Sequence, residues 1–104
     1  MVYRKGSFLN YDSYKTILAE RKNRILTLTL NRSEQLNAID EELHAELSRI
    51  FYDVSSDKDT DVVILTGAGK AFCAGGDLEW INRMHGDPKA FARTVREGKR
   101  IVNG

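Results

Sequence analysis

The sequence predicts an α/β fold, and three features of the chain indicate it. Leucine occupies every second position of the segment 26–30, which is the period of a strand with one buried face. The continuous apolar run at 62–65 is typical of a parallel strand that is covered on both faces. Apolar residues at helical spacing between these two segments predict an amphipathic helix. Strands and helices in this order favour a sheet with helices packed against it.

The first half of the chain predicts two strands and a helix. Residues 1–13 have no clear period, and we expect them to form a leader to a domain that spans 14–104. Segments 14–20 and 24–30 predict strands, and the short polar link between them predicts a hairpin. Asp40 is a good N-cap for the following helix, because its side chain can accept a backbone hydrogen bond. The apolar face of that helix comprises Leu43, Leu47, Ile50, Phe51 and Val54.

The second half of the chain predicts a strand, a glycine-rich loop and two helices. The loop at 67–76 contains four glycines, which permit sharp turns and close backbone approach. Asp77 can cap a short helix that ends at Gly86, and Asp87-Pro88 is a cap followed by a proline at the first helical position. Only three strands can be recognised, so we expect an unfinished sheet. The short helix carries Leu78, Trp80, Ile81 and Met84, and one face of the last helix carries Phe91, Val95, Gly98 and Val102.

Composition and charge argue against several classes of function. Of the 104 residues, 41% are hydrophobic and 30% are charged, which is the balance of a globular domain. A net charge of +1 provides no strong electrostatic footprint for nucleic acid. Two histidines and one cysteine are too few for an ordinary structural zinc site, so we expect no metal. No apolar run has the length of a membrane span or the character of a signal peptide, so we expect no membrane binding and a cytoplasmic or organelle-matrix location.

The glycine-rich loop admits three chemical interpretations. A phosphate-binding loop at Gly67–Lys70 would need Ser or Thr directly after the lysine, where the chain has alanine. A dinucleotide-binding loop would need a third small residue where the chain has Phe72. These two interpretations predict that the chain binds ATP or NAD. An oxyanion-stabilising loop needs backbone N–H groups freed from the sheet by small residues, and Ala74-Gly75-Gly76 meets that demand.

Two segments of the chain resemble the enoyl-CoA hydratase/isomerase (crotonase) family. The first is Leu30-Asn-Arg-Ser-Glu-Gln-Leu-Asn-Ala38, and the second is Val62-Val-Ile-Leu-Thr-Gly-Ala-Gly-Lys-Ala-Phe-Cys-Ala-Gly-Gly-Asp-Leu78. The second motif is long and specific, and the resemblance extends from about Tyr14 to the end of the chain. It implies a crotonase-like spiral of strand-strand-helix units, of which this chain would supply the incomplete N-terminal part.

The resemblance also implies a function and a set of site residues. Members of the family bind an acyl-CoA thioester, and two backbone N–H groups stabilise the enolate-like charge on its carbonyl oxygen. The first of these donors corresponds to the N–H of Gly76, which we expect to be the catalytic group of this chain. Coenzyme A is then part of the substrate, and no separate cofactor is expected. The expected substrate-binding residues, which line the CoA and pantetheine path, are Ala38, Ala74, Gly75, Asp77 and Leu78.

The length of the chain departs from the family pattern. The chain has less than half the usual length, and the second donor loop and the acid and base carboxylates belong to later segments of the family. We therefore expect the 104-residue chain to be inactive alone. The resemblance implies that the complete protein hydrates or isomerises a 2-enoyl-CoA as a homo-oligomer, a trimer or hexamer. An alternative is a non-catalytic module that binds CoA or pairs with a full-length relative.

Other polar and aromatic side chains have simpler interpretations. We expect Asp77 to cap a helix and Cys73 to fill a tight loop as a small apolar residue. We expect His44, which stands among acidic residues, to lie on the solvated surface. Trp80 and Met84 could either line an acyl pocket or serve packing. The basic residues of the last helix are expected to form a solvated face, and they are Arg93, Arg96, Lys99 and Arg100.

Overall fold

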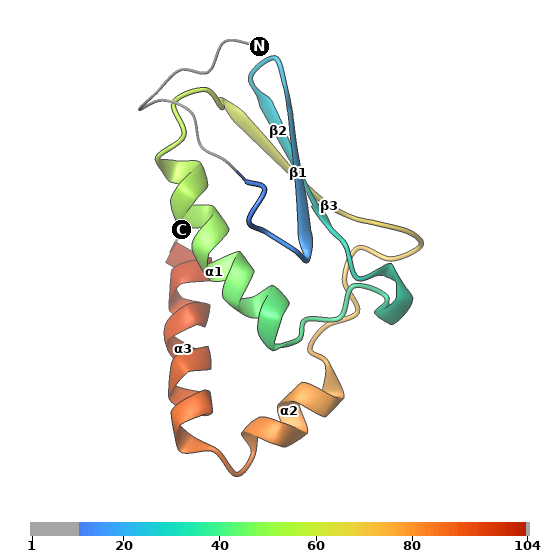
Figure 1. Cartoon of the computed structure of the whole chain (residues 1–104), viewed down its shortest axis with the longest axis vertical. Coiled ribbons are helices and arrows are strands. Elements are labelled where there is room, and N and C mark those ends of the chain that lie inside the picture. The colour runs from blue at the N-terminus through green and yellow to red at the C-terminus, as the bar shows by residue number, and fades with distance from the viewer. Residues whose placement is uncertain (1–10, 104) are drawn as a thin grey trace.

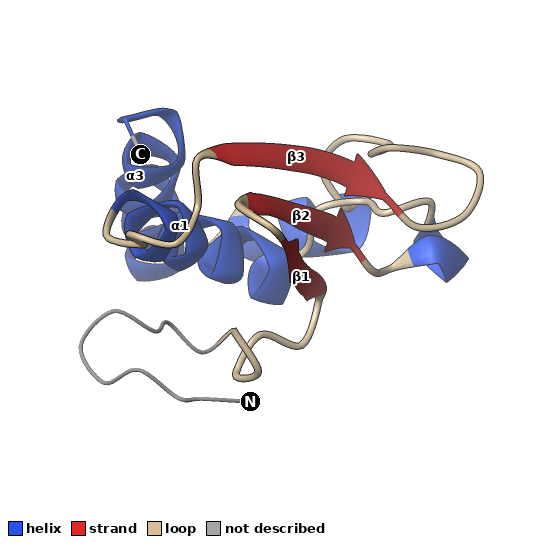
Figure 2. Ribbon diagram, turned by 90° about the horizontal axis from the view of Figure 1, so that it is seen from above, coloured by secondary structure: helices blue, strands red, loops and turns tan. Residues whose placement is uncertain are grey.

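A single sheet organises the computed structural model, which describes residues 11–103. Its strands are β1 (Ile17–Lys22), β2 (Ile25–Leu30) and β3 (Val62–Gly67), with β2 in the middle (Figure 2). β1 runs antiparallel to β2, and β3 runs parallel to it. The helix α1 (Glu41–Ser55) connects β2 to β3, and α3 (Pro88–Asn103) lies beside α1 (Figure 1). A short 3-10 turn (Ser33–Gln35) and the helix α2 (Leu78–Met84) complete the described elements.

The predicted hairpin is confirmed, but β1 begins later than the sequence indicates. Just before Ile17 the backbone N–H groups turn to a helix, because the buried carboxylate of Glu46 in α1 accepts both the Lys15 and the Thr16 N–H at 2.8 Å. The hydroxyl of Thr16 also donates to this carboxylate. Asn23 makes the turn with a φ of 59°, a left-handed conformation that asparagine tolerates well.

The core lies between the sheet and α1, as the two sequence periods predict. The side-chain oxygen of Asp40 accepts the Leu43 N–H at 2.9 Å, so the predicted N-cap is confirmed. The alternating leucines of β2 face the apolar side of α1, and both sets are removed from solvent. Burial of each such side chain stabilises the fold by about 1.5–3 kcal/mol. The buried core comprises Tyr14, Ile17, Leu26, Leu28, Leu30, Leu43, Leu47 and Ile50.

The prediction that β3 is buried on both faces is wrong for this chain. Its four apolar side chains from Val62 to Leu65 are between 36% and 50% exposed. β3 lies at the edge of the sheet, and among the described strands only β2 pairs with it. The apolar composition therefore reflects a strand built for two covered faces, whereas the described residues cover neither fully. The sheet face opposite α1 also exposes Leu18 and Ile25.

The two C-terminal helices begin where the sequence predicts. The carboxylates of Asp77 and Asp87 accept the N–H groups of Trp80 and Ala90, each at 3.1 Å, and cap α2 and α3. α3 packs on α1 partly through polar contacts, since His44 Nδ1 lies 2.7 Å from a carboxylate oxygen of Glu97. The side chain of His44 is 14% exposed, so the surface interpretation of this histidine is wrong. The stripe formed by Phe91, Val95 and Val102 is exposed, as are Arg93, Arg96, Lys99 and Arg100.

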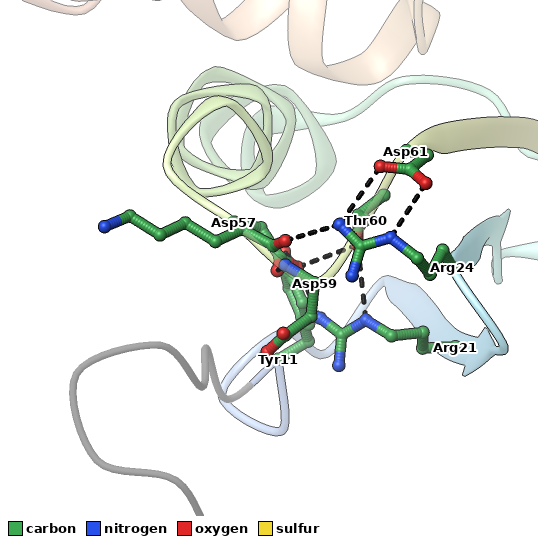
Figure 3. A network of polar contacts seen from close by, with 8 residues as sticks. Tyr11, Arg21, Arg24, Asp57, Asp59, Thr60 and Asp61 are labelled. Carbon is green, nitrogen blue, oxygen red and sulfur yellow. Dashed lines mark hydrogen bonds and ion pairs between the residues drawn. The ribbon is translucent and has the colours of Figure 1, made fainter.

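A cluster of polar side chains joins the hairpin to the end of α1 (Figure 3). Its centre is the buried carboxylate of Asp57, which accepts hydrogen bonds from Tyr11, Arg21 and Thr60. Arg24 forms a separate pair with Asp61 at 2.7 Å. Tyr11 thus packs against the domain, while residues 1–10 of the predicted leader lie outside the described residues.

Candidate functional site

Two loops from distant parts of the sequence meet beyond the ends of β2 and β3. The segments 31–40 and 67–77 are joined by an isolated parallel bridge between Ile39 and Gly76. In this bridge the Ile39 N–H donates to the Gly75 carbonyl at 2.7 Å, and the Asp77 N–H donates to the Ile39 carbonyl at 2.8 Å. A third bond, from the Ala74 N–H to the Leu36 carbonyl, extends the contact. The first motif therefore supports the second motif through backbone bonds.

The buried side chain of Asn37 connects the two loops by hydrogen bonds. Its side chain is fully buried, and its Nδ2 donates to the carbonyl oxygens of Ala68 at 2.9 Å and Ala71 at 2.8 Å. Its Oδ1 accepts the Arg32 N–H at 2.8 Å. The residue also has a φ of 56°, which asparagine adopts more readily than most side chains. One amide thus satisfies three backbone groups that burial would otherwise leave unpaired.

Three glycines of the loop are required, for two different physical reasons. A Cβ atom at Gly67 would lie 2.4 Å from the Phe72 carbonyl oxygen and 2.5 Å from that of Ala71, so no side chain fits there. Gly75 has open space around it but a φ of +99°, a conformation that L side chains rarely adopt. Gly69, with a φ of +76°, meets the same backbone requirement as Gly75. The loop therefore needs Gly67 for close approach, and Gly69 and Gly75 for backbone direction.

Arg32 lies between the caps of two helices. Its Nε is 3.5 Å from a carboxylate oxygen of Asp40, and its Nη2 is 3.7 Å from a carboxylate oxygen of Asp77. Its Nη1 donates to the carbonyl of Ala38. The Arg32 side chain is 15% exposed, so the guanidinium is largely enclosed by these acceptors. One cation therefore connects the start of α1, the start of α2 and the backbone at Ala38.

The N–H of Gly76 remains available in this arrangement. In the parallel bridge Ile39 bonds to the residues on either side of Gly76, so Gly76 uses neither of its own polar groups with Ile39. Among the hydrogen bonds of residues 11–103, none uses the Gly76 N–H as a donor. Gly76 is also exposed, and α2 begins two residues later. A free, accessible backbone donor on a braced loop can stabilise negative charge on a ligand atom.

The structure brings the predicted site residues together around this bridge. Ala38 precedes Ile39 on one loop and is half-buried, while Ala74 and Gly75 precede Gly76 on the other loop and are exposed. Asp77 turns its carboxylate to the backbone of α2 and to Arg32, in keeping with the predicted cap. Leu78 is 76% exposed at the start of α2. The Cys73 side chain packs against the core, as expected of a small apolar residue.

A shallow pocket adjoins the Gly76 loop. Its volume is about 370 Å³, and it lies in the elbow between α2 and α3. A Cβ atom at Gly76 would lie 2.9 Å from the Cδ1 of Ile81, which is one of the residues that line the pocket. Trp80 is buried with its ring 5.2 Å from that of His44, which makes it a packing residue. The pocket lining comprises Ile81, Met84, His85, Asp87, Pro88 and Phe91.

Other functional classes find less support among the described residues. The turn at Gly67–Lys70 does not lead into a helix, because α2 begins only at Leu78, so the phosphate-loop interpretation fails. Between residues 11 and 103, no group of three metal-ligating side chains could hold a metal ion. Within the same residues, no helix is both long and apolar enough to cross a membrane.

Comparison with known proteins assigns this arrangement to a family. The enoyl-CoA hydratase/isomerase family model matches residues 20–101. The chain belongs to the enoyl-CoA hydratase/isomerase family. Among curated relatives, the 1,2-epoxyphenylacetyl-CoA isomerase of Escherichia coli is 45% identical over 62 residues, which cover 60% of this chain and 24% of the relative. The 3-hydroxyisobutyryl-CoA hydrolase 1 of Arabidopsis thaliana is 41% identical over 71 residues, which cover 68% of this chain and 19% of the relative.

Solved structures of the enoyl-CoA hydratase/isomerase family share the fold. An enoyl-CoA hydratase/isomerase from Mycobacterium paratuberculosis matches with a TM-score of 0.81 and 33% identity, over 84% of this chain and 35% of that one. A putative enoyl-CoA hydratase from Streptomyces coelicolor matches with a TM-score of 0.79 and 26% identity, over 99% of this chain and 38% of that one. The predicted crotonase-like α/β fold is therefore confirmed. The chain spans little more than a third of the length of these family members.

Two structurally important residues of this site were not singled out by sequence reasoning. Arg32 and Asn37 stand in the first family motif, but their pattern predicts only a polar loop. Each acts on segments more than 30 residues away in the chain, which include Ala68, Ala71 and Asp77. An asparagine in a predicted loop was the available signal, because asparagine favours left-handed turns.

Proposed function

We propose that this chain supplies the acyl-CoA-binding part of an enzyme that hydrates or isomerises 2-enoyl-CoA thioesters. The observation that carries the proposal is the N–H of Gly76, which has no hydrogen-bond acceptor among the described residues, on an exposed residue held by the Ile39 bridge. When water adds to C3 of an enoyl thioester, negative charge collects on the thioester oxygen before C2 is protonated. A fixed N–H at that oxygen stabilises the charged state, and losing one such donor costs about 3–4 kcal/mol of barrier.

The residues around Gly76 would bind the rest of the thioester. Ala38, Ala74 and Gly75 are small and would let the pantetheine chain pass close to the backbone. Asp77 and Leu78, at the start of α2, would lie beside the thioester. Coenzyme A would enter as part of the substrate, and no separate cofactor takes part in the proposal.

We also propose that the 104 residues do not turn over alone. A single N–H donor polarises the thioester, but hydration also needs a base for the water and an acid for C2. Glu79, the carboxylate next to the loop, is 84% exposed and lies 3.5 Å from Arg83, which does not suit either role. Turnover would need the later family segments, in a cytoplasmic homo-oligomer such as a trimer or hexamer. An intact mass more than double 11.8 kDa for the natural protein would support the need for later segments, whereas hydration of crotonyl-CoA by the 104 residues alone would contradict the proposal.

A pair of substitutions at Gly76 tests the donor. Gly76→Pro removes the N–H, whereas Gly76→Ala keeps it and presses only on the flexible end of Ile81. We expect crotonyl-CoA to shift the Gly76 amide resonance of the unsubstituted chain, with CoA alone shifting it far less. We expect Gly76→Ala to retain most of the affinity for crotonyl-CoA and Gly76→Pro to lose it. Equal affinity of a folded Gly76→Pro variant would contradict the proposed role.

A non-catalytic role in association is the second candidate, and the open sheet favours it. The outer face exposes Leu18, Ile25, Val62 and Ile64, and the free edge of β3 can accept another strand. Light scattering on the 104-residue chain separates the candidates. Concentration-dependent association without binding of crotonyl-CoA would favour this second role, and a stable monomer would argue against it.

A further inference from the structure

We propose that Arg32 is a positioning residue, which holds the Gly76 N–H in place by tying together the two helix caps beside it. The inference rests on the proposed function in one respect, since it takes Gly76 to be the donor. Its structural content, that Arg32 maintains the bridge between Ile39 and Gly76, can be judged without any ligand.

The carboxylates of the two caps divide their oxygens in the same way. Asp40 Oδ1 accepts the Leu43 N–H, and Asp40 Oδ2 faces Arg32. Asp77 Oδ1 accepts the Trp80 N–H, and Asp77 Oδ2 faces the same guanidinium. Each cap therefore holds its own helix with one oxygen and Arg32 with the other. A movement of Arg32 would release both helix starts relative to each other.

The bridge to Gly76 lies between the groups that Arg32 contacts. Ala38, whose carbonyl accepts Arg32 Nη1, and Asp40 flank Ile39 on one loop, and Asp77 follows Gly76 on the other. Arg32 thus contacts both loops immediately beside the bridge. The backbone bonds of Ile39 set the pairing, and the guanidinium prevents the two loops from separating.

Charge gives Arg32 a second effect at the same place. The Asp40 and Asp77 carboxylates stand next to a loop that is proposed to stabilise negative charge, and unpaired they would oppose it. Arg32 offsets both carboxylates while being mostly enclosed, where screening by solvent is weaker. Lysine cannot replace it fully, because an ammonium lacks the planar fork that reaches three separate acceptors.

Hydrogen exchange of single amides tests the positioning role. The Ile39 and Asp77 N–H groups report the bridge, and the Leu47 and Ile50 N–H groups inside α1 report the whole domain. In Arg32→Lys we expect the two bridge amides to exchange about tenfold faster, the order expected from losing one charge-assisted hydrogen bond, that to the Ala38 carbonyl, with little change in α1. An equal rise at all four amides, or no rise, would overturn the inference.

Arg24→Lys is the matched control. Arg24 also contacts a carboxylate and a backbone carbonyl, those of Asp61 and Lys58, but it stands at the opposite end of β2. We expect it to leave the bridge amides unchanged. Asp40→Asn is the second variant if Arg32→Lys does not fold, because asparagine still caps α1 but loses its charge towards Arg32. Asp40→Asn should also speed exchange of the Ile39 and Asp77 amides. If these two amides exchanged as slowly as in the unsubstituted chain, the inference would be overturned.

A ligand arm separates this inference from the proposed function. Crotonyl-CoA is titrated into the unsubstituted chain and into Arg32→Lys, and the Gly76 amide resonance is followed. If that resonance does not move in the unsubstituted chain, the proposed function fails while the exchange result still judges Arg32. If it moves equally in both proteins with equal affinity, Gly76 keeps its role and Arg32 loses the role proposed here.

Discussion

Gly67 lies so close to the side chain of Asn37 that a Cβ atom at Gly67 would stand 2.8 Å from Asn37 Nδ2. The glycine ends β3 and the asparagine belongs to the loop after β2, 30 positions earlier in the chain. The two residues are thus fitted to each other: the buried amide occupies the space that a side chain at Gly67 would need. This contact fixes where the glycine-rich loop leaves the sheet.

Gly67→Ala is expected to destabilise the chain by at least about 1–3 kcal/mol, the usual cost of overpacking. The new methyl group would also meet two backbone carbonyl oxygens at 2.5 Å or less, and backbone cannot move aside as a side chain can. Urea unfolding measures the effect. Gly98→Ala is the control, because open space surrounds Gly98 within α3, and it should stabilise the chain by about 0.5–1 kcal/mol. Equal stability of the two variants would refute this account.

Asn37→Ala is expected to cost at least about 2 kcal/mol, because it leaves buried backbone groups without their partner. Asn37→Gly removes the same hydrogen bonds but readily adopts the observed φ of 56°. Comparing the two free energies of unfolding therefore separates the hydrogen bonds from the backbone conformation. We expect both variants to be well below the unsubstituted chain. A glycine variant of full stability would show that the hydrogen bonds contribute little.

Acid is expected to weaken the junction between the hairpin and α1 at Asp57. Burial by itself raises the pKa of Asp57, but hydrogen bonds outweigh it and hold the pKa below its ordinary value. The donors are the Asp59 N–H, the hydroxyls of Tyr11 and Thr60, and the Arg21 guanidinium. The resulting stability is present above the unfolded-state pKa of about 4 and is lost as the pH falls through the lower folded-state pKa.

Asp57→Asn provides the measurement of that pH dependence. Its free energy of unfolding in urea should be lower than that of the unsubstituted chain at pH 6, and it should fall less between pH 6 and pH 3. If both proteins lost the same stability over this range, Asp57 would not be a source of the acid sensitivity.

Glu97→Ala is expected to loosen α3 from α1 by about 1 kcal/mol, because it removes the partner of the largely buried His44. The ring of Trp80, the single tryptophan, lies 5.2 Å from that of His44, so its fluorescence should report the change. Arg93→Ala removes the exposed pair with Glu41 and should cost no more than about 0.5 kcal/mol. In Glu97→Ala we expect hydrogen exchange to speed up more in α3 than in α1, relative to the unsubstituted chain. An equal loss of stability in the two variants would show that the buried contact stabilises the fold no more than the exposed pair does.

Local patterns in the sequence were enough to predict the order of the elements, the helix caps and the family. Strand and helix periods depend only on local spacing, so the leucines of β2 and the apolar face of α1 predicted which sides are buried. The two motifs were specific enough to predict Gly76 as a donor, and that role stays a prediction. The cap carboxylates of Asp40, Asp77 and Asp87 act within three residues, and for that reason local sequence sufficed to predict them.

The contacts by which distant segments support one another became evident only from the folded chain. The start of β1, the enclosure of His44 and the exposure of β3 depend on partners far along the chain, such as Glu46 and Glu97. The same holds for Asn37 and Arg32, since a side chain's hydrogen bonds to remote backbone leave no period in the sequence. The glycine-rich motif and its family resemblance therefore predicted which loop carries the proposed donor, whereas three-dimensional packing decided what holds that loop in place.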